Sequence, residues 1–241
     1  MDTMKTVFIS RLVLILLLTA FLTSCFENET KPDALGDAYI LVEMNGQDTL
    51  KGLGLHAFSY YEFATVTASL TGNANLTYTL APFLNYSQDF LWVTPTSQFS
   101  KNLPPTGDYV FNATFKEGQS LIFYDKLTAD IISPPKVTEC AYSKSTLRVN
   151  LSWDVVKNAD LYNVKLYDLS GKLLFVSEVL GTNIKNFSFS SDTQGWLATA
   201  STPDDGQSVI VEINAYLLEF GKSTDELQCI SKSRNQIVWG N

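Results

Sequence analysis

Histidine and cysteine are scarce in this sequence, which contains one histidine, His56, and three cysteines among 241 residues. A single histidine excludes His-rich metal sites and leaves most catalytic triads without their base. No cysteine spacing matches a zinc site, and no Gly-x-Ser-x-Gly segment marks a serine hydrolase. Gly221-Lys222-Ser223 lacks the earlier glycine of a phosphate-binding loop, because Tyr216 occupies that position. We therefore expect no catalytic residue, no metal, no cofactor and no enzymatic activity.

Positive charge is also in short supply, with 17 lysines and arginines against 25 aspartates and glutamates and a net charge of −8. Proteins that bind nucleic acid carry a basic surface, so nucleic acid is not an expected partner. The same deficit argues against attachment through anionic lipid head groups. The apolar run Leu12–Leu22 is shorter than the ~20 residues that a membrane-spanning helix needs.

The N-terminus has the order of a secretion signal: a short basic region, the apolar segment Leu12–Leu18, then small and polar residues up to Cys25. Its end, Leu22-Thr23-Ser24-Cys25, resembles the cleavage box of bacterial lipoproteins. The resemblance implies that residues 1–24 are a signal peptide and that Cys25 carries the lipid that anchors the chain to the membrane.

The residues after the cysteine, Phe26-Glu27-Asn28-Glu29, are similar to the acidic export signal of Bacteroidetes lipoproteins. This resemblance implies an outer-membrane lipoprotein at the cell surface, with the periplasmic face as the open alternative. Residues 25–36 are polar, contain a proline and lack apolar periodicity, which predicts an acylated flexible tether.

Two cysteines, Cys140 and Cys229, remain after the anchor is assigned. Exported proteins meet an oxidising environment, so a disulfide between these two is one expectation. Two buried free thiols are the other.

Short runs with alternating apolar residues follow the tether and predict strands, with a hairpin turn at Asn45-Gly46. Gly107-Asp108-Tyr109 opens one such strand and resembles the sixth strand of an immunoglobulin-like sandwich. That resemblance implies that the tyrosine side chain turns back and bonds the corner that it leaves. We predict an immunoglobulin-like β-sandwich over residues 37–130, followed by a proline-rich linker over residues 131–136.

Residues 137–241 resemble a fibronectin type III domain, on the segments Val149-Asn150-Leu151-Ser152-Trp153 and Ala159-Asp160-Leu161-Tyr162. In that family the tryptophan of the second strand packs against the tyrosine of the third. Val209 stands where the sixth strand usually begins with tyrosine, so the tyrosine corner is absent here. The predicted fold class is all-β, with two tandem antiparallel β-sandwiches behind a lipoprotein signal peptide.

Aromatic residues cluster in two stretches of the first half, which contain Tyr60, Tyr61, Tyr86 and Trp92. Exposed rings stack on sugar rings, so these four residues are the candidate glycan contacts. The alternative is that they fill the core of the sandwich, as aromatic residues in strands usually do.

These features predict a non-catalytic cell-envelope lipoprotein that acts as a binding, adhesion or structural module at the outer membrane. Its expected partners are the membrane, through the lipid anchor, and a glycan or protein ligand. The alternative is a glycan-binding surface lipoprotein of a polysaccharide-utilisation system. A third hypothesis, a hydrolase with two facing carboxylates in a cleft, has no spacing of acidic residues in its favour.

Overall fold

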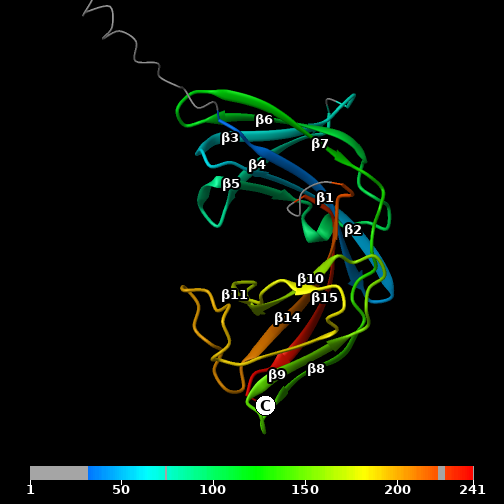
Figure 1. Cartoon of the computed structure of the whole chain (residues 1–241), viewed down its shortest axis with the longest axis vertical. Helices are drawn as coiled ribbons and strands as arrows, with labels where there is room; N and C mark the ends of the chain where they lie inside the picture. Colours follow the sequence, from blue (N-terminus) through cyan, green and yellow to red (C-terminus); the bar gives the residue numbers. More distant parts are fainter. Residues whose placement is uncertain (1–31, 74, 222–225, 241) are drawn as a thin grey trace, which may run out of the picture. The chain divides into compact units, whose positions relative to one another are not determined.

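The computed structural model of the protein describes residues 32–73, 75–221 and 226–240, and these are almost entirely β (Figure 1). They form fifteen strands and one short 3₁₀ helix, η1 (Thr96–Gln98). Among these residues, none belongs to a helix long and apolar enough to cross a membrane.

The first sandwich is made of strands β1 to β7 in two sheets that share β4. Four strands lie in the order β1-β2-β5-β4, and β4 also begins the order β4-β3-β6-β7. The strand order is that of fibronectin type III and immunoglobulin-like sandwiches. The bounds are β1 (Leu35–Asn45), β2 (Asp48–Phe58), β3 (Phe63–Leu70), β4 (Thr77–Phe83), β5 (Tyr86–Val93), β6 (Gly107–Phe115) and β7 (Ser120–Leu127).

The second sandwich repeats this plan with β8 to β15. One sheet has the order β13-β9-β8, and the other has the order β11-β10-β14-β15. The short β12 pairs with β10. The bounds are β8 (Val137–Ser143), β9 (Arg148–Trp153), β10 (Leu161–Asp168), β11 (Leu173–Val176), β12 (Leu180–Gly181), β13 (Asn186–Phe189), β14 (Ser208–Leu218) and β15 (Leu227–Val238).

Local motifs of both sandwiches have the predicted contacts. In the first, the Tyr109 hydroxyl donates to the carbonyl oxygen of Pro105 at 2.8 Å, which confirms the predicted tyrosine corner. In the second, Trp153 and Tyr162 are buried with ring centroids 5.6 Å apart, which confirms their predicted packing. The predicted all-β class with two sandwiches is therefore confirmed.

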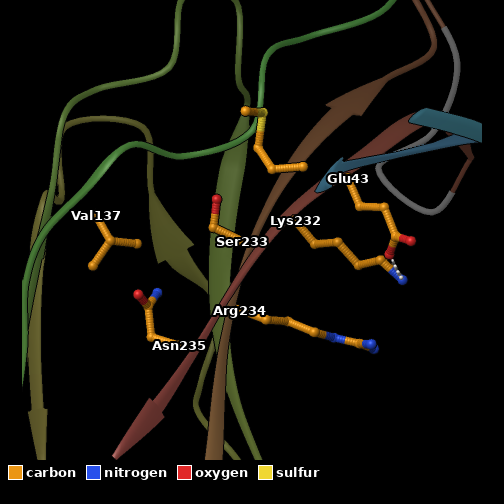
Figure 2. Close-up of a pocket in the computed structure, with 7 residues that line it drawn as sticks. Glu43, Val137, Lys232, Ser233, Arg234 and Asn235 are labelled. Atoms are coloured by element: carbon orange, nitrogen blue, oxygen red, sulfur yellow. Dashed lines mark ion pairs between the residues drawn. The ribbon is translucent and has the colours of Figure 1, made fainter. Parts of the chain in front are cut away.

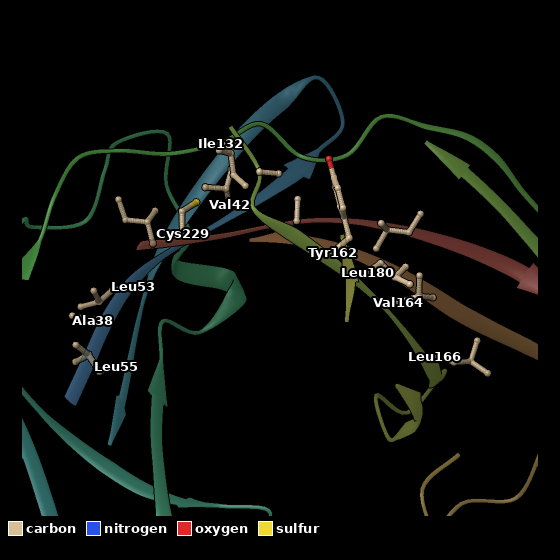
Figure 3. Packing of buried hydrophobic residues seen from close by; sticks show 14 of the residues in the cluster. Ala38, Val42, Leu53, Leu55, Ile132, Tyr162, Val164, Leu166, Leu180 and Cys229 are labelled. Atoms are coloured by element: carbon tan, nitrogen blue, oxygen red, sulfur yellow. The ribbon is translucent and has the colours of Figure 1, made fainter. Parts of the chain in front are cut away.

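A feature that the sequence does not predict joins the two sandwiches. Residues Ile40–Glu43 of β1 pair in parallel with Cys229–Lys232 of β15, while the same strand pairs along its length with β2. The sheet that contains β1 and the sheet that contains β15 thereby become one continuous path of strands. Buried residues of both halves belong to one hydrophobic cluster, as Figure 3 shows for Leu53 and Leu55 on one side and Val164 and Leu166 on the other.

The segment between β7 and β8 is also fastened to β15. The Gln228 side chain donates to the carbonyl oxygens of Thr128 and Asp130, and the Ser233 hydroxyl donates to that of Pro135. Residues 33–241 form one compact unit. The domain boundary at residues 131–136 stays a prediction. The predicted tether ends two residues late, because β1 already begins at Leu35.

Candidate functional site

The four predicted glycan contacts differ in exposure. Tyr60 is 85% exposed and Tyr86 is 62% exposed. Tyr61 and Trp92 are partly buried and pack against the core. The Tyr61 ring meets Phe115 edge-on, and Trp92 lies against Tyr78 with 4.4 Å between ring centroids. Two of the four residues therefore support the core, and two present their rings to solvent.

The structure brings Tyr60 and Tyr86 to the same end of β5. The Gln88 side chain donates to the Tyr60 carbonyl oxygen at 2.8 Å, and the Ser87 hydroxyl donates to Glu62 at 2.6 Å. Trp92 lies six residues beyond Tyr86, or roughly 20 Å at strand rise. The four residues therefore do not form one platform, and glycan contact stays a prediction.

The three cysteines differ in where they lie and in what the structure shows of them. The predicted lipid attachment site, Cys25, lies outside the described residues. Cys140 and Cys229 are both free thiols in the structure, so no disulfide joins β8 to β15 there. Burial raises the pKa of each thiol to about 11, which keeps both protonated at neutral pH. Cys229 lies at the joint between the sandwiches, beside Ile132 (Figure 3).

A set of charged side chains lies on the outer face of the sheet that contains β10, β14 and β15. Core residues alternate with polar ones along these strands, so the polar side chains share the opposite face. Lys165, Glu212 and Arg234 stand directly opposite one another on the three strands. In the next row, Lys232 pairs with Glu43 of β1. We call these five residues the charged face.

Glu212 is the buried centre of the charged face. Its Oε2 accepts from the Arg234 Nε at 2.7 Å, and its Oε1 accepts from the Asn214 amide at 3.1 Å and the Tyr167 hydroxyl at 3.4 Å. Burial favours a higher pKa for Glu212, but the charges of Arg234 and Lys232 outweigh it and hold the pKa below its usual value. Glu212 is therefore an ionised anchor around which the cations are arranged.

Lys165 differs from the other cations of the charged face. In the described part of the chain, its ammonium has no hydrogen bond and no ion pair. Burial lowers the pKa of Lys165, and the positive charges of Lys232 and Arg234 lower it further, whereas Glu212 raises it. A half-buried ammonium without a direct partner is a group that an anionic ligand would stabilise.

Lys232 and Arg234 are held by aromatic rings as well as by carboxylates. The Lys232 ammonium lies 5.6 Å from the ring centre of Phe99 and 3.1 Å from Glu43, and the Arg234 guanidinium lies 5.9 Å from that of Tyr167. Figure 2 shows Lys232 and Arg234 pointing to one side of β15. Cation–π contacts restrict both side chains while leaving charge available.

A pocket of about 230 Å³ lies where β1 leaves β15. Its lining residues are Glu43, Met44, Val137, Lys232, Ser233, Arg234 and Asn235 (Figure 2). Two of the cations of the charged face thus border a space that is large enough for a small polar group.

The sequence pattern alone does not predict the charged face. Its only local signal is the alternation of Lys165 and Glu212 with buried residues along their strands. An ordinary solvated strand face has the same pattern, so only the strand order reveals that the charges converge.

A second cluster of charge, missed for the same reason, lies near the start of β1. Carboxylate oxygens of Asp37, Asp125 and Glu219 lie within 4.8 Å of one another, a spacing that could hold a metal ion. Asp37 accepts from the backbone N–H of Leu227 at 3.1 Å, and Asp125 accepts from that of Ala38 at 2.7 Å. Burial, helped by the neighbouring carboxylates, raises the pKa of Asp37 to about 8. These contacts tie β1 to β7 and β15, so we treat the cluster as a structural joint and assign no metal to it.

The only histidine belongs to neither cluster. His56 Nε2 lies 2.7 Å from the Asp89 carboxylate, and both side chains are partly exposed. This pair joins β2 to β5.

No protein-family model matches this chain, and no curated protein matches it either. Among solved structures, it is similar to dimeric latent PorU from Porphyromonas gingivalis, with 11% identity over 88% of this chain and 20% of that one and a TM-score of 0.28. It is similar to a two-domain fibronectin type III segment of chicken tenascin, with 11% identity over 86% of this chain and 99% of that one and a TM-score of 0.28.

A third similar structure is the 47-kilodalton lipoprotein of Treponema pallidum, with 12% identity over 83% of this chain and 50% of that one and a TM-score of 0.35. The chain spans less than two thirds of the length of PorU and of this lipoprotein. Similarities of this size say nothing about what the chain binds, and the fold rests on the strand order described above.

Proposed function

We propose that this chain is a non-catalytic binding module of the bacterial cell envelope, held at the outer membrane by a lipid on Cys25. We further propose that its charged face binds a ligand with carboxylate or sulfate groups. An acidic glycan has this chemistry, in keeping with the glycan-binding hypothesis.

One observation carries the proposal: three cations lie around the buried carboxylate of Glu212. Lys165, Lys232 and Arg234 are opposed by Glu212 and Glu43, which leaves the charged face with one excess positive charge. The chain as a whole has a net charge of −8, so this excess is local. Charge-assisted hydrogen bonds to an anion are the strongest polar contacts that such a face can offer.

The same geometry supports a binding role and not a catalytic one. Glu212 has a lowered pKa and accepts hydrogen bonds from Arg234, Asn214 and Tyr167. A general acid needs the opposite shift, because it must hold a proton near neutral pH. The carboxylate is thus suited to fix the cations in place.

Binding of a polyuronate to the purified mature chain tests the ligand class. Lys165→Gln is the informative variant, because Lys165 lacks an ion pair and its loss leaves the Arg234–Glu212 pair intact. We expect about a tenfold loss of affinity, the equivalent of ~1.4 kcal/mol for one charge-assisted contact. Lys144→Gln removes an exposed charge from the β8–β9 turn and serves as the matched control.

Equal affinity of the two variants, or equal binding of neutral dextran, would refute the charged face as the site.

The lipid anchor has its own test. Cys25→Ala should move the protein from the membrane fraction to the soluble fraction, and continued membrane association of this variant would contradict the anchor.

A further inference from the structure

Four exposed apolar or aromatic side chains lie at one end of the first sandwich. Tyr60 is in the β2–β3 turn, and Phe83, Leu84 and Tyr86 form the β4–β5 hairpin. We call these four residues the hairpin patch. Leu84, at the tip of the hairpin, is 58% exposed. Water is a poor environment for such a group, so a partner that covers it would gain apolar contact.

The backbone conformation at the tip of the hairpin is unusual for a leucine. Leu84 and Asn85 have φ angles of 51° and 66°, the left-handed pair of a two-residue hairpin turn. Asparagine and glycine adopt this conformation readily, but leucine does so at a cost. The chain therefore presents a large apolar side chain at a position where a small polar one would fit better.

The described chain begins beside this patch. The Ser59 hydroxyl donates to the Asp33 carbonyl oxygen at 2.6 Å, and the Ser59 backbone N–H donates to the Gln88 carbonyl oxygen at 3.0 Å. The first described residues, the β2–β3 turn and the start of β5 are thus bonded to one another. Only eight residues lead from Cys25 to Asp33, and such a length spans at most about 28 Å.

Charged side chains near the hairpin patch are paired with one another, so they do not prevent contact between the patch and a lipid surface. Lys116 pairs with Glu62 at 3.0 Å, and His56 lies beside Asp89. The four residues of the patch are themselves uncharged. Tyrosine, phenylalanine and leucine favour the boundary between head groups and acyl chains, where an aromatic ring meets apolar tails and a hydroxyl meets water.

We propose that the hairpin patch rests in the head-group region of the same membrane that holds the lipid of Cys25. This inference rests on the proposed lipid anchor. The patch alone is too small for stable attachment, but the anchor holds it at the bilayer and the patch then orients the sandwich. The lipid surface is zwitterionic, because the patch offers no cations for anionic head groups.

Tryptophan fluorescence in vesicles with brominated acyl chains tests this proposal. The acylated mature chain is placed in vesicles of phosphatidylcholine and phosphatidylethanolamine, with and without bromine on the acyl chains. Tyr86→Trp and Leu84→Trp add a fluorophore to the patch. Tyr124→Trp adds one at an equally exposed position on β7 and is the matched control. The four native tryptophans give the baseline.

We expect the brominated lipid to remove at least half of the added fluorescence in Tyr86→Trp and Leu84→Trp, and none in Tyr124→Trp. Quenching that is the same at all three positions would overturn the proposal. So would a fluorescence change of Tyr86→Trp on addition of a soluble polysaccharide without quenching by brominated lipid, which would instead indicate a glycan site. Flotation of the vesicles distinguishes failure of the proposed lipid anchor from failure of the proposed membrane contact of the patch. A chain that fails to float contradicts the lipid anchor. A chain that floats with the vesicles but is not quenched contradicts only the contact of the patch.

Discussion

The two sandwiches share a strand order but fasten their loops with different tyrosines. In the first, Tyr109 on the sixth strand donates its hydroxyl to Pro105. In the second, Val209 occupies that place, and Tyr162 on the third strand accepts from the backbone N–H of Val156 at 2.8 Å. A buried hydroxyl thus secures a connecting segment in both halves, although from different strands. Each buried hydroxyl has a backbone partner, and the fold does not require one position for the tyrosine.

The halves also differ in what they expose. The first sandwich presents the apolar hairpin patch, whereas the second presents the charged face. Strand β1 belongs to both, because Glu43 at its end completes the ion pair with Lys232. The two halves therefore expose different surfaces although β1 joins them into one unit.

The largest expected effect is at the joint, in the pH dependence of Asp37→Asn. Asp37 keeps its proton up to about pH 8 when folded but loses it near pH 3.8 when unfolded. The free energy of unfolding of the wild type should therefore fall as pH rises through this window and level off above it. The free energy of unfolding of Asp37→Asn, measured relative to that of the wild type, should therefore rise by about 1.4 kcal/mol per pH unit across the window, to a total on the order of 5 kcal/mol.

Urea unfolding of both proteins at a series of pH values from 4 to 9 measures this difference. A difference that stays constant across the series would mean that Asp37 is ionised in the folded protein.

Next in size is the core of the second sandwich. Trp153→Ala removes a buried ring that packs on Tyr162, so it should lower the free energy of unfolding by about 3 to 5 kcal/mol. Urea unfolding followed by circular dichroism measures the loss. Tyr124→Ala, at an exposed position, should change the midpoint little, and an equally small change for Trp153→Ala would remove Trp153 from the core.

Smaller losses of stability are expected when the hydroxyls of Tyr109 and Tyr162 are removed, and the two losses should differ. Tyr162→Phe leaves the buried N–H of Val156 without its acceptor and should cost about 2 kcal/mol. Tyr109→Phe removes only a donor to Pro105 and should cost about 1 kcal/mol. Thermal unfolding of both variants gives the order, and the reverse order would contradict the roles assigned to the two hydroxyls.

The smallest effect is expected at the hairpin of the first sandwich. Leu84→Asn places a residue suited to the left-handed conformation at the turn, so it should raise the free energy of unfolding by about 1 kcal/mol. Differential scanning calorimetry measures the shift in melting temperature. A lower melting temperature would show that Leu84 stabilises the folded chain.

Local motifs account for what the sequence predicted correctly. Gly107-Asp108-Tyr109 and the pair of Trp153 and Tyr162 occupy fixed places in the sandwich fold, so their contacts follow from residue order. The pairing of β1 with β15 could not be predicted this way. It joins strands almost 190 residues apart in parallel, and no nearby turn or spacing marks it.

The site residues show the same limit. Tyr60 and Trp92 are both aromatic residues of the first sandwich, yet the first is exposed and the second packs on the core. Exposure depends on which face of a strand or turn meets the second sheet, and that is fixed by register. Lys165 and Glu212 become neighbours of Arg234 and Lys232 only through the order of the three strands β10, β14 and β15.

The central claim is that β1 joins the two sandwiches into one cooperative unit. The joint rests on the pairing of Ile40–Glu43 with Cys229–Lys232. Trp92 is the only tryptophan of the first sandwich, whereas Trp153, Trp196 and Trp239 belong to the second, so fluorescence can follow each half separately.

The deciding measurement is urea unfolding of the wild type and of Trp92→Phe, followed by tryptophan fluorescence. The signal of Trp92→Phe reports the second half alone, and the difference between the two signals reports the first half. We predict one transition with the same midpoint for both halves. Two transitions in the wild-type chain, of which Trp92→Phe keeps only one, would show that the sandwiches unfold independently and would contradict the joint.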